Sequence, residues 1–179
     1  MKYFTPDLIA RGQSEDSHIL NEVEALWDER CARYNAYLAS IREEMCPGLR
    51  HIEDNYYLHD AVVRGMGQRD GTFVIVLQLD TPPHALLTFT YELAEPPRID
   101  PTVLPESARS QGEVVEWQYD EIEKTSGEPP VWRHSILLSN GWEVVIHFRD
   151  VKVEEMQALL PAPRADALPL PVVGLSHPV

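Results

Sequence analysis

His59 and Asp60 are adjacent in the stretch YYLHDAVV, and both side chains are of types that suit metal or acid–base chemistry. A His-Asp pair is typical of metal-dependent phosphohydrolases when it lies on a helix and other helices supply further His and Asp ligands. Here the pair runs directly into a strand-like alternation that begins at Val62. The context therefore favours a structural role, in which one of the two side chains satisfies backbone groups where a strand begins. A role in chemistry is the alternative.

A predicted hairpin brings two further histidines together. If Asn140-Gly141 are the two residues of a tight turn, Ser139 pairs with Trp142. Counting outward from that pair places His134 directly opposite His147, with Cβ atoms about 5 Å apart. Two such imidazoles would begin a zinc or nickel site, but catalytic zinc generally needs three protein ligands. The side chains that could supply the third are His59, Asp60, Glu116 and Glu143. Nothing in the sequence requires one of them to do so, and opposed histidines are usually packing partners.

The sequence does not favour a cysteine nucleophile, a phosphate-binding loop or a pair of catalytic carboxylates. Cys31 and Cys46 fall on a predicted helix, and Cys46 lies near its C-terminal end, where the helix dipole disfavours a thiolate. The stretch RGMGQRDG has the glycine spacing of neither a dinucleotide-binding nor a Walker motif. The acidic stretch EWQYDEIEK suggests a solvated strand face, with Trp117 and Tyr119 turned the other way. We therefore predict no catalytic residue and no cofactor.

The elements that would position these residues begin with a long helix. From Ile19 to Met45 apolar side chains recur at three- and four-residue steps, Ser14 or Ser17 can cap the start, and Pro47-Gly48 is expected to end the helix. A helix of roughly 30 residues is about 45 Å long, more than a strand can cover, so part of it should project.

Three aromatic side chains of this helix, Trp27, Tyr34 and Tyr37, lie on its apolar stripe. The default interpretation is that they cover the sheet. The alternative is a docking surface for a protein partner or for a second copy of the chain.

Beyond Asn55 the apolar period changes from that of a helix to that of strands. Asp70-Gly71 and Asn140-Gly141 are turn dipeptides that predict two hairpins, and two more strands are expected between them. The expected fold is α+β, with a long N-terminal amphipathic helix packed on an antiparallel sheet of about six strands built from hairpins. The expected segments are a helical part at 1–50, a β domain at 51–160 and a proline-rich extended tail at 161–179.

Composition limits the partners. The 179 residues hold 15 Lys and Arg against 29 Asp and Glu, a formal charge of −14, which disfavours nucleic acid and anionic membranes as partners. The sequence has no long apolar stretch and no signal-peptide pattern at its start, so we expect a soluble cytoplasmic protein. A basic protein is the kind of partner that an acidic surface would suit.

Six stretches that span most of residues 1–150 are informative together: MKYFTPDL, YLASIREEM, LHDAVV, LLTFTYE, WQYDEIE and GWEVVIHF. With them the chain resembles a bacterial family of uncharacterised proteins whose members begin MKYFT and carry an LHDA-type strand followed by an LTF strand. That family has no established activity, so the resemblance implies no catalytic residue. Similar LHD and LTF hairpins occur in small β-rich bacterial modules, including some contact-toxin immunity proteins.

The leading functional hypothesis is a non-enzymatic protein-binding or accessory module, with an immunity protein as one version. The alternative is a metal-dependent hydrolase that uses His134 and His147 with His59 or Asp60. A third possibility is a homodimer built on the long helix.

Overall fold

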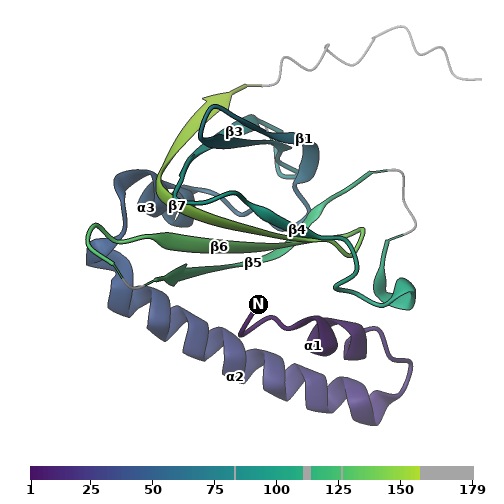
Figure 1. Ribbon diagram of the computed structural model, residues 1–179. Coiled ribbons are helices and arrows are strands. Elements are labelled where there is room, and N and C mark those ends of the chain that lie inside the picture. The colour runs from purple at the N-terminus through teal and green to yellow at the C-terminus, as the bar shows by residue number, and fades with distance from the viewer. Residues whose placement is uncertain (83, 111–113, 126, 158–179) are drawn as a thin grey trace, which may run out of the picture.

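The computed structural model describes residues 1–82, 84–110, 114–125 and 127–157, so the predicted tail at 161–179 lies outside the described residues. Within them the chain forms an α+β fold, in which N-terminal helices flank a curved antiparallel sheet (Figure 1). This agrees with the fold class expected from the sequence. No helix in the described ranges is long and apolar enough to cross a membrane.

The helical elements are α1 (Pro6–Arg11), α2 (Ser17–Ile41), a 3-10 turn (Arg42–Glu44) and α3 (Pro47–Asn55). Thr5 caps α1, and Asp16, rather than either predicted serine, caps α2 by accepting the His18 N–H. Part of the long helix was expected to project beyond the sheet, and the N-terminal half of α2 packs beside α1.

The long helical run ends before Pro47-Gly48, as predicted, but these two residues also begin a further helix, α3, that was not expected. Proline is well tolerated at the first position of a helix, where its missing N–H is not needed. A Cβ on Gly48 would lie 1.6 Å from the carbonyl oxygen of Val151, so glycine lets α3 approach the sheet backbone closely.

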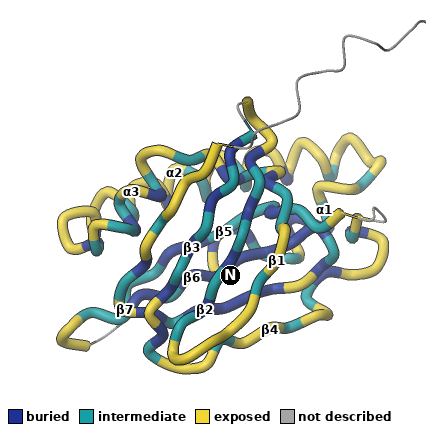
Figure 2. The backbone as a smooth tube through the Cα atoms, turned by 90° about the horizontal axis from the view of Figure 1, so that it is seen from above, coloured by how far each residue is buried: buried dark blue, intermediate teal, exposed yellow. Residues whose placement is uncertain are grey.

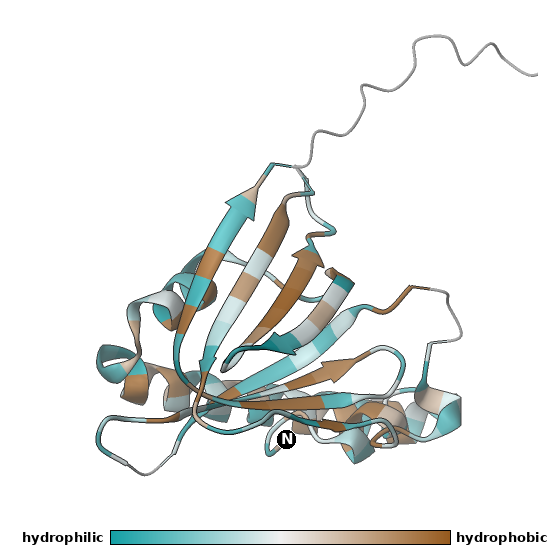
Figure 3. Cartoon of the chain, turned by 45° about the horizontal axis from the view of Figure 1, so that its top comes forward, coloured by the Kyte–Doolittle hydropathy of each residue, from teal (hydrophilic) through white to brown (hydrophobic). Residues whose placement is uncertain are grey.

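Within the described residues the sheet has seven strands: β1 (Val62–Arg69), β2 (Thr72–Gln78), β3 (Leu86–Leu93), β4 (Arg98–Asp100), β5 (Trp117–Lys124), β6 (Trp132–Leu138) and β7 (Glu143–Met156). Their order is β1-β2-β3-β7-β6-β5, and β4 pairs with the first part of β7. The long strand β7 pairs with β6 through its first half and with β3 through its second, and the sheet bends into a half-barrel (Figure 3). Val62 bridges Glu116, so one end of β1 meets the start of β5.

The first hairpin has the register that the sequence predicts near its turn. Arg69 pairs with Thr72 across Asp70-Gly71, whose φ angles are both positive, as the primed turns of twisted hairpins require. A bulge between Val63 and Gly65 shifts the far end of β1. In Figure 2 the edge strand β1 is largely exposed, while β2 beside it alternates buried and half-buried residues.

The second hairpin corrects the predicted histidine pair. Its turn has three residues, since Leu138 donates to the Trp142 carbonyl and Gly141, at φ 85°, closes the turn. Every pair is thereby displaced by one position: His134 pairs with Ile146, and His147 pairs with Arg133. Adjacent strand positions point to opposite faces, so the two imidazoles lie on different sides of the sheet.

The main core lies inside the half-barrel. Leu49 and Ile52 of α3 are buried there against inward side chains of the sheet, among them Phe89 and Ile146. The other face of β5 and β6 is covered by the N-terminal segment: the buried Glu121 carboxylate accepts the backbone N–H groups of Lys2, Tyr3 and Phe4 at 2.6 to 2.7 Å. The prediction that the acidic residues of β5 form a solvated face is therefore wrong at Glu121.

Candidate functional site

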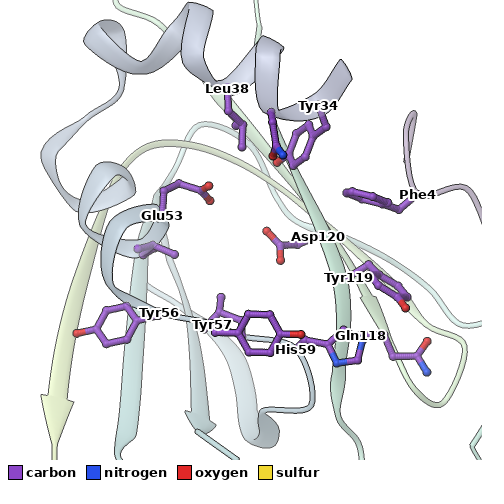
Figure 4. A pocket seen from close by; sticks show the side chains of 13 residues that line it. Phe4, Tyr34, Leu38, Glu53, Tyr56, Tyr57, His59, Gln118, Tyr119 and Asp120 are labelled. Atoms are coloured by element: carbon purple, nitrogen blue, oxygen red, sulfur yellow. The ribbon is translucent and has the colours of Figure 1, made fainter. Parts of the chain in front are cut away.

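A pocket of about 360 Å³ opens between the second half of α2, α3, the link that follows α3, and β5 (Figure 4). Its lining residues are Phe4, Tyr34, Asn35, Leu38, Ile52, Glu53, Tyr56, Tyr57, Leu58, His59, Gln118, Tyr119 and Asp120. Two carboxyl groups thus lie in a largely aromatic and aliphatic wall.

Asp120 reaches the pocket because β5 is irregular near its start. The pairing of β5 with β6 shifts between Trp117 and Tyr119, so these two rings do not share a face as strict alternation would have them do. Tyr119 contacts Phe4, and Trp117 is buried in the core with its indole Nε1 donating to Asp120 Oδ1 at 2.8 Å. The carboxylate of Asp120 is therefore held from inside the sheet.

His134 holds the other oxygen of Asp120. Its Nε2 lies 3.0 Å from Asp120 Oδ2, its Nδ1 lies 3.0 Å from the Tyr91 hydroxyl, and its side chain is 0% exposed. Burial raises the pKa of Tyr91 well above its usual value. The phenol therefore keeps its proton and can donate it to Nδ1, and the Nε2 N–H can then donate to Asp120.

Glu53 of α3 supplies the second carboxyl group. Desolvation by burial, together with the nearby charges of Asp120 and Asp54, raises the pKa of Glu53 to about 7, and Arg42 opposes the shift. Arg42 itself binds Asp54 at 2.7 Å. No residue in the described part of the chain forms a hydrogen bond or ion pair with the Glu53 side chain. In Figure 4 its carboxyl group points into the pocket toward Asp120, which projects from the opposite wall.

Aromatic rings form much of the remaining wall. Tyr57 stacks on His59 with ring centroids 6.0 Å apart, and His59 meets the Tyr119 ring edge-on at 5.1 Å. The Tyr57 residue is 69% exposed, so its ring is open to a ligand. Tyr34 closes the α2 side, and burial next to Asp120 and Glu53 raises the pKa of its phenol.

The structure places His59 and Asp60 where β1 is about to begin, as the sequence indicated. The backbone N–H of Asp60 donates to the Trp117 carbonyl, and the two side chains pair with each other at 2.9 Å between Nδ1 and Oδ2. His59 also lines the pocket, a position that the strand pattern did not reveal.

The four predicted metal-ligand candidates do not converge. His134 is in the core, His59 and Asp60 pair at the rim, and His147 pairs with Glu95 at 2.6 Å on the other face of the sheet. Among the described residues no group of three or more His, Cys, Asp or Glu side chains is arranged to hold a metal ion.

The aromatic residues of α2 face the protein. The hydroxyls of Tyr34 and Tyr37 accept the backbone N–H groups of Ile122 and Lys124 at 2.7 and 2.8 Å. These N–H groups lie on the free edge of β5, so α2 protects an edge that could otherwise pair with another strand. The Trp27 ring lies 4.8 Å from that of Tyr119. All three residues are thus used for internal contacts, in keeping with the covering role.

Sequence reasoning missed Glu53, Asp120 and Tyr91. Glu53 was missed because α3 itself was not expected. Asp120 lies two positions before the apolar Ile122, a spacing that puts both side chains on the same, inward face of a strand. The bulge between Trp117 and Tyr119 breaks the strict alternation, so counting from Trp117 assigns Asp120 to the wrong face. Tyr91 is an ordinary inward residue of β3, and only pairing across the sheet brings it to His134.

No protein-family model matches the sequence, and no curated protein matches it at a significant level.

Proposed function

We propose that the chain is a non-enzymatic binding protein that holds a ligand group in the pocket between α2, α3 and β5. The observation that carries the proposal is the Glu53 carboxyl group, which is half-buried, points into the pocket and has no hydrogen-bond or ion-pair partner among the described side chains. Desolvating a carboxyl group without pairing it costs stability, and such groups cluster at functional sites.

The fixed orientation of Asp120 supports this proposal. Trp117 and His134 each bind one oxygen of its carboxylate, so little rotamer freedom remains to be lost when a ligand binds. His134 is fully buried, so it can orient Asp120 but cannot itself touch a ligand.

The ligand group can belong to a protein partner, which would keep the expected accessory role. A toxin-neutralising immunity protein is one version, suggested by the resemblance of the LHD and LTF stretches. Co-expression with toxins encoded beside the gene tests that version, and it fails if none is bound or neutralised.

A thermal-shift screen of chemically varied small molecules and short peptides tests the general proposal. A ligand at a hundred times its dissociation constant stabilises the fold by about 2.7 kcal/mol. Hits should lose their effect in Glu53→Gln and in Tyr57→Ala, whose exposed ring can be removed without disturbing the core. Glu24→Gln, which removes an exposed carboxylate of α2, is the charge-matched control and should respond like the wild type. Hits that stabilise the pocket variants as strongly would contradict the proposal, and so would a screen without hits.

Acid–base catalysis is a second candidate, favoured by the Glu53 pKa of about 7 beside a fixed Asp120 carboxylate. Such a group can give or take a proton near neutral pH. The test is mass spectrometry of each hit after prolonged incubation with the protein. Conversion that is lost in Glu53→Gln, while binding is retained, would identify an enzyme, and unchanged ligands would reject this candidate.

A further inference from the structure

We propose that the pocket binds an organic cation, a primary ammonium or guanidinium group carried on an aliphatic chain. This inference rests on the proposed function and names the chemistry of its ligand.

Charge is the first argument. None of the thirteen lining residues is a lysine or an arginine, whereas Glu53 and Asp120 both direct carboxyl groups into the space. Arg42, whose charge acts on Glu53 from outside the lining, is paired with Asp54. An anionic ligand would meet two carboxyl groups in a lining without lysine or arginine, whereas a cation would pair with them.

The wall chemistry is the second argument. Tyr57 and Tyr119 line the same pocket as the carboxyl groups, and a cation within about 6 Å of a phenol ring is attracted by its π face. Leu38, Ile52 and Leu58 supply apolar surface for the methylene groups of the ligand. Rings and carboxylates together are the arrangement by which proteins recognise alkylammonium groups.

Proton release is the consequence that distinguishes this ligand class. The charged and titratable groups around Glu53 are Asp120 of β5, Asp54 of α3, Arg42 of the 3-10 turn, Tyr34 of α2 and His59 of the link. A bound cation adds a positive charge to this set, favours the ionised form of Glu53 and displaces its proton. With half-ionisation near pH 7, about a tenth of the protein is ionised at Glu53 at pH 6, so affinity should be about tenfold lower there than at pH 8.

The experiment is an NMR titration of the full chain with four probes of similar size: butylammonium, butylguanidinium, butanol and butyrate. The two cations should produce saturable amide shifts around Glu53, Tyr57 and Asp120, and the neutral and anionic probes should not. Glu53→Gln should weaken butylammonium at least fivefold and abolish the dependence on pH. Glu24→Gln should leave both unchanged. His59→Gln, the control for the histidine in the pocket wall, should keep the dependence on pH.

Two further probes separate the sources of the cation. N-acetyl-lysine N-methylamide imitates a side chain of a protein partner, and putrescine represents a free amine. Tighter binding of the former assigns the pocket to a partner's side chain, and tighter binding of the latter assigns it to a small metabolite.

Saturable pocket shifts with butanol or butyrate, but not with the cations, would overturn the cation inference and leave the pocket as a binding site. Cation binding that persists unchanged in Glu53→Gln would also overturn it. If no probe produces saturable shifts, the inference fails by itself, and the broader ligand screen decides separately whether the pocket is a binding site.

Discussion

His134 Nε2 lies 3.0 Å from Asp120 Oδ2, and this contact joins the core of the sheet to the floor of the pocket. Because Tyr91 binds the opposite nitrogen of the same imidazole, a residue of β3 sets the hydrogen-bonding state of a carboxylate on β5. Asp120 and the two residues that orient it from below, Trp117 and His134, thus lie on strands, which is the arrangement that holds a polar group in one orientation.

Removing the Tyr91 hydroxyl should lower stability. Tyr91→Phe leaves the buried Nδ1 of His134 without its hydrogen-bond partner, at an expected cost of about 1 to 3 kcal/mol in the free energy of unfolding. Urea denaturation measures the cost. Tyr57→Phe is the control, because that residue is exposed, and it should change stability by less than about 0.5 kcal/mol. Equal effects of the two substitutions would show that the buried contact contributes nothing.

Two tyrosine hydroxyls should control hydrogen exchange at one sheet edge. Tyr34→Phe removes the acceptor of the Ile122 N–H and Tyr37→Phe that of Lys124, so each substitution should speed exchange at its own amide. Tyr34→Phe should also cost about 1 kcal/mol, and Tyr37→Phe less, since Tyr37 is only half-buried and water can replace its hydroxyl. Residue-resolved hydrogen–deuterium exchange provides the measurement. Acceleration spread evenly along β5 would instead indicate that the substitutions loosen the whole helix.

Glu53 should make the protein less stable as the pH rises. Its pKa is about 7 in the folded state against an ordinary value of 4.5, so the folded state binds this proton more tightly than the unfolded state. The two states are equally protonated below pH 4.5. Between pH 4.5 and 7 the unfolded state loses the proton first, so the contribution of Glu53 to folding falls, and above pH 7 the loss is complete.

The variant Glu53→Gln removes that dependence. Its stability relative to the wild type should therefore rise from pH 4 to pH 8, by at most about 3 kcal/mol. Denaturant unfolding at several pH values checks this, and Glu24→Gln at an exposed helical position serves as the control. A difference that stays constant with pH would mean that Glu53 is hydrated and ordinary.

The contact between α3 and β7 should depend on a single glycine. Gly48→Ala would place a Cβ 1.6 Å from the Val151 carbonyl oxygen, so α3 must move away from the sheet, and we expect a loss of at least about 3 kcal/mol. Gly65→Ala and Gly67→Ala on the edge strand β1 meet nothing within 4 Å and should be close to neutral. Thermal unfolding of the three variants makes the comparison. An equally mild effect at Gly48 would show that α3 does not lie as close to β7 as the structure has it.

The sequence by itself determined the features that depend on neighbouring residues. The apolar period of α2, the turn residues Asp70-Gly71 and the alternation along β2 are local signals, and each corresponds to an element of the structure. Even the inner positions of the first hairpin, Ile75 and Leu77, could be named from the turn and the period of two.

Only the tertiary structure determined which side chains meet at the candidate site, because their positions depend on strand register and on contacts between distant elements. One extra residue in the Asn140-Gly141 turn moved His147 away from His134 and left His134 facing Asp120 and Tyr91. A one-residue slip reverses the face of every side chain beyond it, and a dipeptide that forms both two- and three-residue turns cannot specify which occurs. The packing of α3 into the half-barrel places Glu53 against that carboxylate, and no local pattern encodes a contact made across so many residues of chain.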